Sequence, residues 1–167
     1  ELQKKSPEEL SSLMGLSQNL SMLNFERNMN WHMPKQPSED IRQAMFAFKG
    51  DVYVGLDSES LSKADIKYAQ KNLAILSGLY GLLRPLDLMY PYRLEMGTKM
   101  ENVRGKNLYE FWGNKITKSV NARAKENSSQ GIVNLASVEY FSSVKIENLE
   151  LPVYSPVFKD FKNGKYK

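Results

Sequence analysis

Hydrophobic residues in the first part of the chain recur with the spacing of α-helices. The segment Ser6–Glu9 reads Ser-Pro-Glu-Glu, a capping box with proline at the first helical position, and Gly15 is a natural helix end. A second helical pattern covers residues 17–30. The apolar residues that we expect it to direct inward are Leu20, Met22 and Leu23. These patterns predict a pair of N-terminal helices.

Shorter segments follow. A third helix is expected over residues 38–48, capped by Ser38, and residues 52–54 (Val-Tyr-Val) have the composition of a short strand. Ser62 is expected to cap a fourth helix. The apolar run 73–76 fits either the end of that helix or a buried strand, and its periodicity does not separate the two.

The second half of the chain mixes extended segments with helices. Prolines keep residues 84–93 extended or turning, and a strand is expected at 94–96. Residues 107–124 carry the clearest helical stripe in the sequence. A strand at 131–135 and a short helix at 137–144 come next.

The pattern as a whole predicts a mixed α/β (α+β) fold. Asn163-Gly164 predicts a closing hairpin between residues 153–161 and the residues from Lys165 onward. We expect a short-stranded sheet surrounded by helices, in a single domain over residues 1–167. Both ends of the chain look abrupt, which suggests the core of a longer protein without its N- and C-terminal segments.

Composition narrows the class of protein. With 41% hydrophobic and 25% charged residues, the chain can bury a core. It contains no apolar run long enough to span a membrane, and no secretory leader is expected. The absence of cysteine excludes disulfides and thiolate metal sites and agrees with a cytoplasmic location. His32 is the single histidine, and no carboxylate spacing typical of a metal site is present, so no cofactor is expected.

Positive charge is concentrated in the middle of the chain. The net charge is +4, and residues 84–125 alone carry nine basic and four acidic side chains. If folding gathers these cations on one face, that face attracts polyanions. The alternative is a set of solvated cations scattered over several helices.

Residues 77–93 combine glycines, arginines and tyrosines. Gly78 and Gly81 permit close backbone approach, so that their N–H groups could converge on an anion. Arg84 and Arg93 carry guanidinium groups suited to phosphate oxygens. Three aromatic residues could stack or donate hydroxyl hydrogen bonds: Tyr80, Tyr90 and Tyr92.

A purely structural interpretation of the same residues stays open. The glycines could form a simple turn, and the tyrosines could belong to the core. The arginines could pair with Asp87 and Glu95. A serine–histidine–aspartate triad is disfavoured, because His32 lies in a proline-rich loop. Acid–base chemistry would fall to Asp87, Glu95 or Glu139.

Several blocks of the sequence closely resemble the YaaA family of bacterial peroxide-stress proteins. They are Ala47–Tyr53, Leu76–Asp87, Pro91–Gly97, Leu108–Gly113, Asn134–Tyr140 and Pro156–Lys159. The resemblance implies a cytoplasmic protein that limits damage linked to free iron. It also implies an α/β fold with a basic cleft, a helix-hairpin-helix element and binding to double-stranded DNA. Gly78 and Gly81 are the nearest match to the hairpin glycines, which places that element at about residues 63–90.

Three functions follow as hypotheses. The favoured one is binding of the DNA backbone with little base readout. Its expected contact residues are Lys49, Ser77, Gly78, Tyr80, Gly81, Arg84, Tyr92, Arg93, Lys99, Arg104 and Lys106. The alternatives are an enzyme acting on a nucleic-acid or phosphorylated substrate through Asp87, Glu95 or Glu139, and an interaction protein whose basic surface is incidental. No membrane partner is expected, and the sequence identifies no protein partner.

Overall fold

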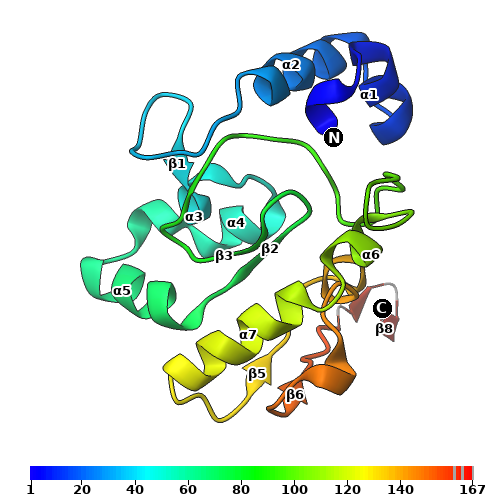
Figure 1. The fold of residues 1–167 in the computed structure, drawn as a ribbon. Coiled ribbons are helices and arrows are strands. Elements are labelled where there is room, and N and C mark those ends of the chain that lie inside the picture. Colours follow the sequence, from blue (N-terminus) through cyan, green and yellow to red (C-terminus); the bar gives the residue numbers. More distant parts are fainter. Residues whose placement is uncertain (160, 163, 167) are drawn as a thin grey trace.

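The computed structural model describes residues 1–159, 161–162 and 164–166. Within them the chain forms eight α-helices, three short 3-10 helices and four two-stranded sheets (Figure 1). The expected mixed α/β class is confirmed. The expectation of one sheet surrounded by helices is wrong, because the strands are only two or three residues long and pair in separate places.

The N-terminal helices begin and end where the sequence predicts. A 3-10 helix, η1 (Leu2–Lys4), precedes α1 (Pro7–Met14) and α2 (Gln18–Met29). The backbone N–H of Ser6 donates to the Glu9 carboxylate at 2.7 Å, and the Glu9 N–H donates back to the Ser6 hydroxyl at 3.2 Å. Gly15 ends α1 with φ +63°, a conformation that glycine adopts without strain.

The inward face predicted for α2 is wrong. Leu20, Met22 and Leu23 are 39–45% exposed, whereas Ser21 and Asn24 are buried. The buried pair satisfies itself within the helix: the Ser21 hydroxyl donates to the Gln18 carbonyl at 2.9 Å, and the Asn24 amide donates to the Leu20 carbonyl at 2.8 Å. Small or internally bonded polar side chains can therefore occupy the face that packs inward.

The helix predicted over residues 38–48 is replaced by β1 (Arg42–Gln43) and α3 (Ala44–Ala47). β1 pairs antiparallel with β4 (Leu88–Met89). The Ala44 N–H donates to the Asp87 carbonyl at 2.9 Å. This long-range bonding delays the helix by several residues, which local capping signals do not reveal.

Residues 52–54 are helical, so the predicted strand is wrong. They belong to α4 (Asp51–Leu56), which is followed by η2 (Ser58–Ser60). Val52 and Val54 are both more than 70% exposed. Tertiary context outweighs the β-propensity of these valines, since no described strand lies alongside them.

The capping box at Ser62 is confirmed, and it begins α5 (Lys63–Asn72). The ambiguous run that follows becomes a strand: β2 (Ile75–Ser77) pairs antiparallel with β3 (Gly81–Leu83). A β-hairpin therefore stands where a second helix was needed. Placement of a helix-hairpin-helix element at residues 63–90 is wrong.

Residues 84–93 are extended and turning, as predicted, but the strand expected at 94–96 is not formed. Leu94 and Met96 are buried and alternate with exposed neighbours, yet the segment pairs with no described strand. It belongs to a long connection that runs from β4 to α6, between the N-terminal helices and the β2–β3 hairpin (Figure 1).

The helix predicted over residues 107–124 is two helices. They are α6 (Leu108–Trp112) and α7 (Lys115–Glu126), separated at Gly113, whose φ of +49° and ψ of −117° break the helical path. Asn107 caps α6, with the Glu110 N–H donating to its side chain at 2.9 Å.

The C-terminal elements are shorter than expected. They are β5 (Ile132–Val133), α8 (Val138–Phe141), η3 (Ile146–Asn148), β6 (Val153–Tyr154), β7 (Phe161–Lys162) and β8 (Lys165–Tyr166). The hairpin is confirmed by the pairing of β7 with β8, although Asn163 lies outside the described residues. The sequence did not predict that β5 and β6 pair in parallel.

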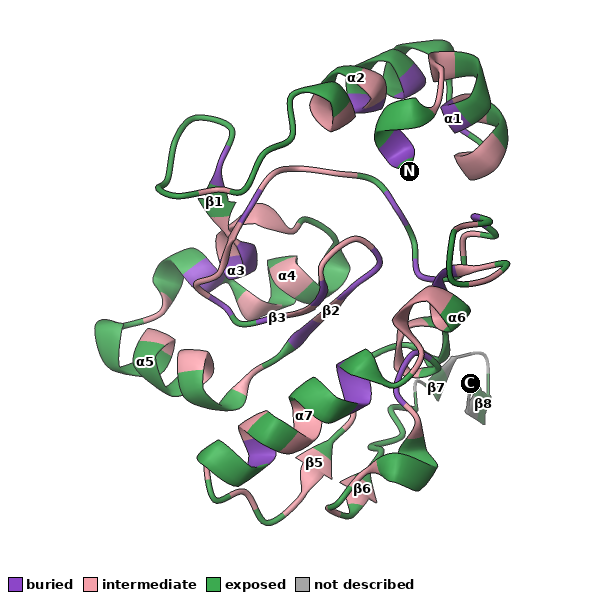
Figure 2. Ribbon diagram, viewed as in Figure 1, coloured by how far each residue is buried: buried purple, intermediate pink, exposed green. Residues whose placement is uncertain are grey.

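Two hydrophobic clusters form the core. One joins the N-terminal helices to the long connection and to α6 and α7, through residues such as Leu10, Met96 and Ile116. The other surrounds Met45 beside the β2–β3 hairpin. Tyr92 packs against both clusters, and buried positions run along this connection (Figure 2). The connection is thus held by the core on its buried side and exposes its other side to solvent.

Candidate functional site: a pocket on residues 93–99

The polar centre of residues 77–93 is used inside the protein. Ser77 is fully buried, and its hydroxyl bonds the Tyr92 hydroxyl at 2.5 Å and accepts from the Tyr80 N–H at 2.9 Å. Burial raises the pKa of Tyr92 well above the usual tyrosine range, although the bond to Ser77 opposes that shift. The pair acts as a neutral hydrogen-bonded brace between β2 and the long connection.

The two glycines of this region are packed against protein atoms. A Cβ on Gly78 would collide with the Leu94 carbonyl, and the Trp112 indole N–H donates to the Gly78 carbonyl at 3.0 Å. Gly81 has φ +77°, and a Cβ there would lie 2.8 Å from the Trp112 ring. Both glycines are buried, so their close approach serves the packing of α6 on the hairpin.

Tyr80 is also engaged. Its hydroxyl accepts from the Trp31 indole N–H at 3.1 Å and from the Tyr90 backbone N–H at 3.0 Å. Its ring meets Tyr92 edge to face, with centroids 5.5 Å apart. These contacts tie the loop after α2 to the end of β4.

The predicted cations fall into different surroundings. Arg84 is clamped by Asp87, which accepts from its backbone N–H at 2.8 Å and from its Nε at 2.9 Å. Arg104 lies over the Phe111 ring, with its Cζ 4.7 Å from the centroid. Lys49 lines a separate cavity of about 220 Å³. The structure therefore does not show a single cleft that contains all of the predicted cations.

Two of the predicted cations do meet, in a larger pocket of about 450 Å³. Its lining residues are Leu13, Met14, Arg93, Glu95, Gly97, Thr98, Lys99 and Glu139. They come from the end of α1, from the long connection and from α8. The pocket thus combines Arg93 and Lys99 with the two carboxylates, Glu95 and Glu139, that the sequence put forward for acid–base chemistry.

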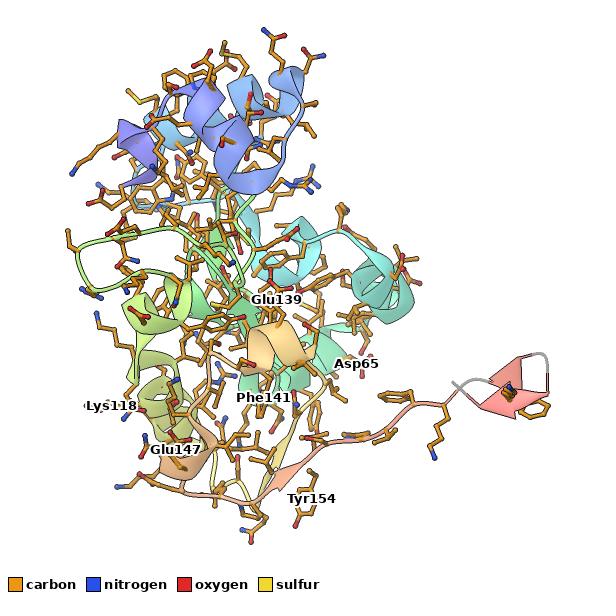
Figure 3. The ribbon with its side chains drawn as sticks, turned by 90° about the vertical axis from the view of Figure 1, so that its right-hand side faces the viewer. Asp65, Lys118, Glu139, Phe141, Glu147 and Tyr154 are labelled. Carbon is orange, nitrogen blue, oxygen red and sulfur yellow. The ribbon has the colours of Figure 1, made fainter. Side chains whose placement is uncertain are left out.

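Hydrogen bonds hold both the side chain and the backbone of Glu139 in place at the pocket. One of its carboxylate oxygens accepts from the Gly97 N–H at 2.8 Å, and its backbone carbonyl accepts from the Tyr109 hydroxyl at 3.0 Å. Ser137 caps α8 by accepting from the Tyr140 N–H. In Figure 3, Glu139 lies above α8, towards the N-terminal helices, and Phe141 lies below it.

Burial and the carboxylates of the pocket together raise the pKa of two neighbouring tyrosines. Burial raises the pKa of Tyr140, and the negative charges of Glu139 and Glu95 raise it further. Tyr109 shows the same direction of pKa shift, caused by burial and then by Glu139. Both carboxylates therefore lie within electrostatic range of one hydroxyl, as expected for neighbours in one pocket.

Sequence reasoning missed the apolar side of the pocket. Leu13 and Met14 lie on the apolar face of α1, and no local signal in the sequence places them beside residues 93–99. A sequence signal could have identified Gly97 and its neighbour Thr98. A glycine directly after the alternating residues 94–96 indicates that another part of the protein approaches the backbone closely there. Arg123, counted among the cations, is instead used inside the fold: it donates to three carbonyls at the end of α5 at 3.0 Å.

Other chemistries find little support in the described part of the chain. No group of three or more histidine, aspartate or glutamate side chains there is placed to hold a metal ion. His32 meets the Tyr90 hydroxyl, with its Nε2 at 2.7 Å. Among the helices of the described ranges, none is both long and apolar enough to cross a membrane.

Comparison with known proteins places the chain in a family. A family model described as "Peroxide stress protein YaaA" matches residues 1–167. UPF0246 proteins of Paraburkholderia phytofirmans and Burkholderia thailandensis are each 53% identical, over 99% and 100% of this chain and 64% and 65% of their own length. A UPF0246 protein of Aliivibrio fischeri is 55% identical over 97% of this chain and 62% of its own length. The chain thus spans a little under two thirds of these relatives, and it belongs to the YaaA family of peroxide stress proteins.

Proposed function

We propose that this chain acts in the cytoplasmic response to hydrogen peroxide by binding the backbone of double-stranded DNA, and so limits damage linked to free iron. The family description supports the role in peroxide stress. When lysine and arginine side chains of a protein bind DNA phosphates, they release the cations condensed on the DNA. DNA covered by the protein would therefore hold fewer metal ions, which links DNA binding to protection from iron.

The observation that carries the proposal is the set of exposed cations along one segment. Arg93, Lys99, Arg104 and Lys106 are all exposed and lie on the connection between β4 and α6. Among the described residues, the one ion pair that involves any of them joins Arg93 and Glu95 at 4.0 Å, the outer limit of such contacts. Arg104 and Lys106, which form no ion pair among the described residues, keep their attraction for phosphate, whereas Arg93 and Lys99 share a pocket with Glu95 and Glu139.

Arg104 and Lys106 suit phosphate contacts best. Stacking on Phe111 orients the Arg104 guanidinium and leaves its N–H edge free to meet phosphate oxygens. Ser77, Gly78, Gly81 and Tyr92 contribute by holding the segment in place, because their polar groups or backbones are used internally.

A salt titration tests this proposal. We expect the logarithm of the DNA association constant to fall linearly with the logarithm of salt concentration, by about 0.9 per neutralised phosphate. The double variant Arg104→Ala/Lys106→Ala should weaken binding and make the slope shallower by about 1 per lost contact. Fluorescence anisotropy with a labelled duplex measures both.

The matched control is Lys63→Ala/Lys67→Ala, which removes two exposed cations from α5. It should leave the slope close to that of the parent chain. If both double variants change the slope equally, binding is a general effect of net charge and the proposed surface is wrong.

The 450 Å³ pocket favours a second candidate, an enzyme acting on a nucleic-acid or phosphorylated substrate. Glu95 and Glu139 lie in this pocket together with two cations. Asp87 forms an ion pair with Arg84 instead, so it is no longer a candidate for acid–base chemistry. On this candidate, Glu139→Gln abolishes turnover even at substrate concentrations that saturate the variant. Absence of turnover across a panel of nucleotide and nucleic-acid substrates argues against it.

A further inference from the structure

The charges of the 450 Å³ pocket do not match a continuous phosphate backbone. Two cations, Arg93 and Lys99, are opposed by two carboxylates, Glu95 and Glu139. The carboxylates leave room for a single phosphate beside the two cations, and the cations repel a metal ion. A ligand with one anionic group and several hydrogen-bond donors satisfies both kinds of side chain.

The charges are available to such a ligand. In the described part of the chain, Lys99 forms no ion pair, and Arg93 approaches Glu95 only to 4.0 Å. Glu139 spends one oxygen on the Gly97 N–H, and a carboxylate has about four acceptor positions in total. Its other oxygen can therefore accept a hydrogen bond from a sugar hydroxyl or a base amino group.

The pocket also has an apolar wall and a suitable size. Leu13 and Met14 are half-buried at the end of α1 and line one side of it. A flat ring packs well on leucine and on the flexible, polarisable methionine. The volume of about 450 Å³ lies in the range of roughly 300–1,000 Å³ typical of small-molecule sites.

We propose that this pocket binds a single nucleotide unit. Arg93 and Lys99 hold its phosphate, Glu139 and Glu95 accept from its sugar or base, and Leu13 and Met14 pack against the base. The nucleotide can be a free mononucleotide or one unit of a nucleic-acid chain. The proposal rests on the pocket alone and requires neither the backbone binding by Arg104 and Lys106 nor any turnover.

Calorimetric titration with the four ribonucleoside monophosphates, with inorganic phosphate and with adenosine tests the proposal. We expect at least one mononucleotide to bind with a Kd in roughly the millimolar range or tighter, and more tightly than phosphate or adenosine. Equal affinity for phosphate and the mononucleotides, or no binding of any mononucleotide, overturns it.

Two variants localise the binding. Glu139→Gln keeps an oxygen for the Gly97 N–H but loses the charge, and Lys99→Gln removes the free cation; each should weaken mononucleotide binding about tenfold or more. The control is Glu147→Gln, an exposed glutamate on η3 outside the pocket (Figure 3). Equal weakening by Glu147→Gln places the nucleotide elsewhere and overturns the proposal.

A competition experiment shows whether the bound nucleotide is free or part of a nucleic-acid chain. It also tests the pocket separately from binding of the DNA backbone. If a single-stranded oligonucleotide displaces the mononucleotide and Glu139→Gln weakens the oligonucleotide, the ligand is a unit of a nucleic-acid chain. If the oligonucleotide does not compete, the ligand is a free nucleotide. Arg104→Ala/Lys106→Ala should weaken duplex binding and leave mononucleotide binding unchanged, so either proposal can fail without the other.

Discussion

At the scale of single residues, two tyrosines of the core have raised pKa values because their side chains are buried. Burial raises the pKa of Tyr53 to about 12 and moves that of Tyr92 upward as well. Tyr53 stacks on Phe48 with ring centroids 5.3 Å apart, and Tyr92 bonds to Ser77. These side chains are neutral parts of the core whose polar ends matter to stability.

We predict that the chain loses stability in alkali because of these two tyrosines. Their pKa is higher in the folded chain than the usual 10.0, so the unfolded chain releases their protons first. The stabilisation is complete below about pH 10 and is lost as the pH rises towards about 12. Urea unfolding between about pH 9 and about pH 11.5 measures this slope.

Tyr53→Phe and Tyr92→Phe should each flatten the fall in stability, because phenylalanine has no proton to release. Tyr68→Phe serves as the control, since Tyr68 is 72% exposed. A fall with pH that is equally steep in all three variants would contradict the assignment.

At the scale of elements, the break between α6 and α7 lets one stretch of sequence pack in two different places. Gly113 turns the chain so that α6 packs on the β2–β3 hairpin through Trp112, while α7 runs on to meet the end of α5. The helical stripe over residues 107–124 hides this break, because Gly113 is a weak signal within a long apolar pattern.

Two glycine substitutions should have opposite effects. Gly113→Ala forces alanine to φ +49° and ψ −117°, and we expect it to destabilise the chain by about 1–3 kcal/mol. Gly55→Ala lies within α4 with open space around its Cβ, and should stabilise the chain by about 0.5–1 kcal/mol. Urea unfolding gives both values, and a destabilising Gly55→Ala together with a neutral Gly113→Ala would refute this account.

At the scale of the whole molecule, the long connection joins the two hydrophobic clusters. Met96 is fully buried in the cluster beneath the N-terminal helices, and Met45 is buried in the other. Tyr92 touches both. We infer that the clusters unfold together, because the connection cannot leave one of them without disturbing the other.

We predict that Met96→Ala and Met45→Ala each lower the free energy of unfolding by about 2–5 kcal/mol and shift one common transition. Met33→Ala, at a side chain that is 70% exposed, should change it by less than about 0.5 kcal/mol. Circular dichroism and tryptophan fluorescence, recorded on the same samples, follow the transition. Two separate transitions in either core variant would show that the clusters unfold independently.

Capping boxes in the sequence predicted helix starts correctly, whereas segments that depend on distant residues were predicted wrongly. Helix starts with a capping box, at Ser6 and Ser62, were confirmed because all the partners lie within four residues. The helix expected at Ser38 and the strand expected at 52–54 were wrong, because bonds to residues 85–89 and the lack of a described neighbouring strand decided those segments. Of the predicted site, Arg93, Lys99, Glu95 and Glu139 came together.

Local chemistry in the sequence by itself determined the mixed α/β class, the capped helix starts, the closing hairpin and the residue types of the candidate site. It also carried the family resemblance, which is spread over separate blocks. Only the tertiary structure decided which face of α2 is buried, that Ser77 and the glycines serve packing, and that Leu13, Met14 and Glu139 surround residues 93–99. The physical reason is distance along the chain: a cap is settled by neighbours a few residues away, whereas this pocket requires α1 and α8, more than a hundred residues apart, to be packed on one connection.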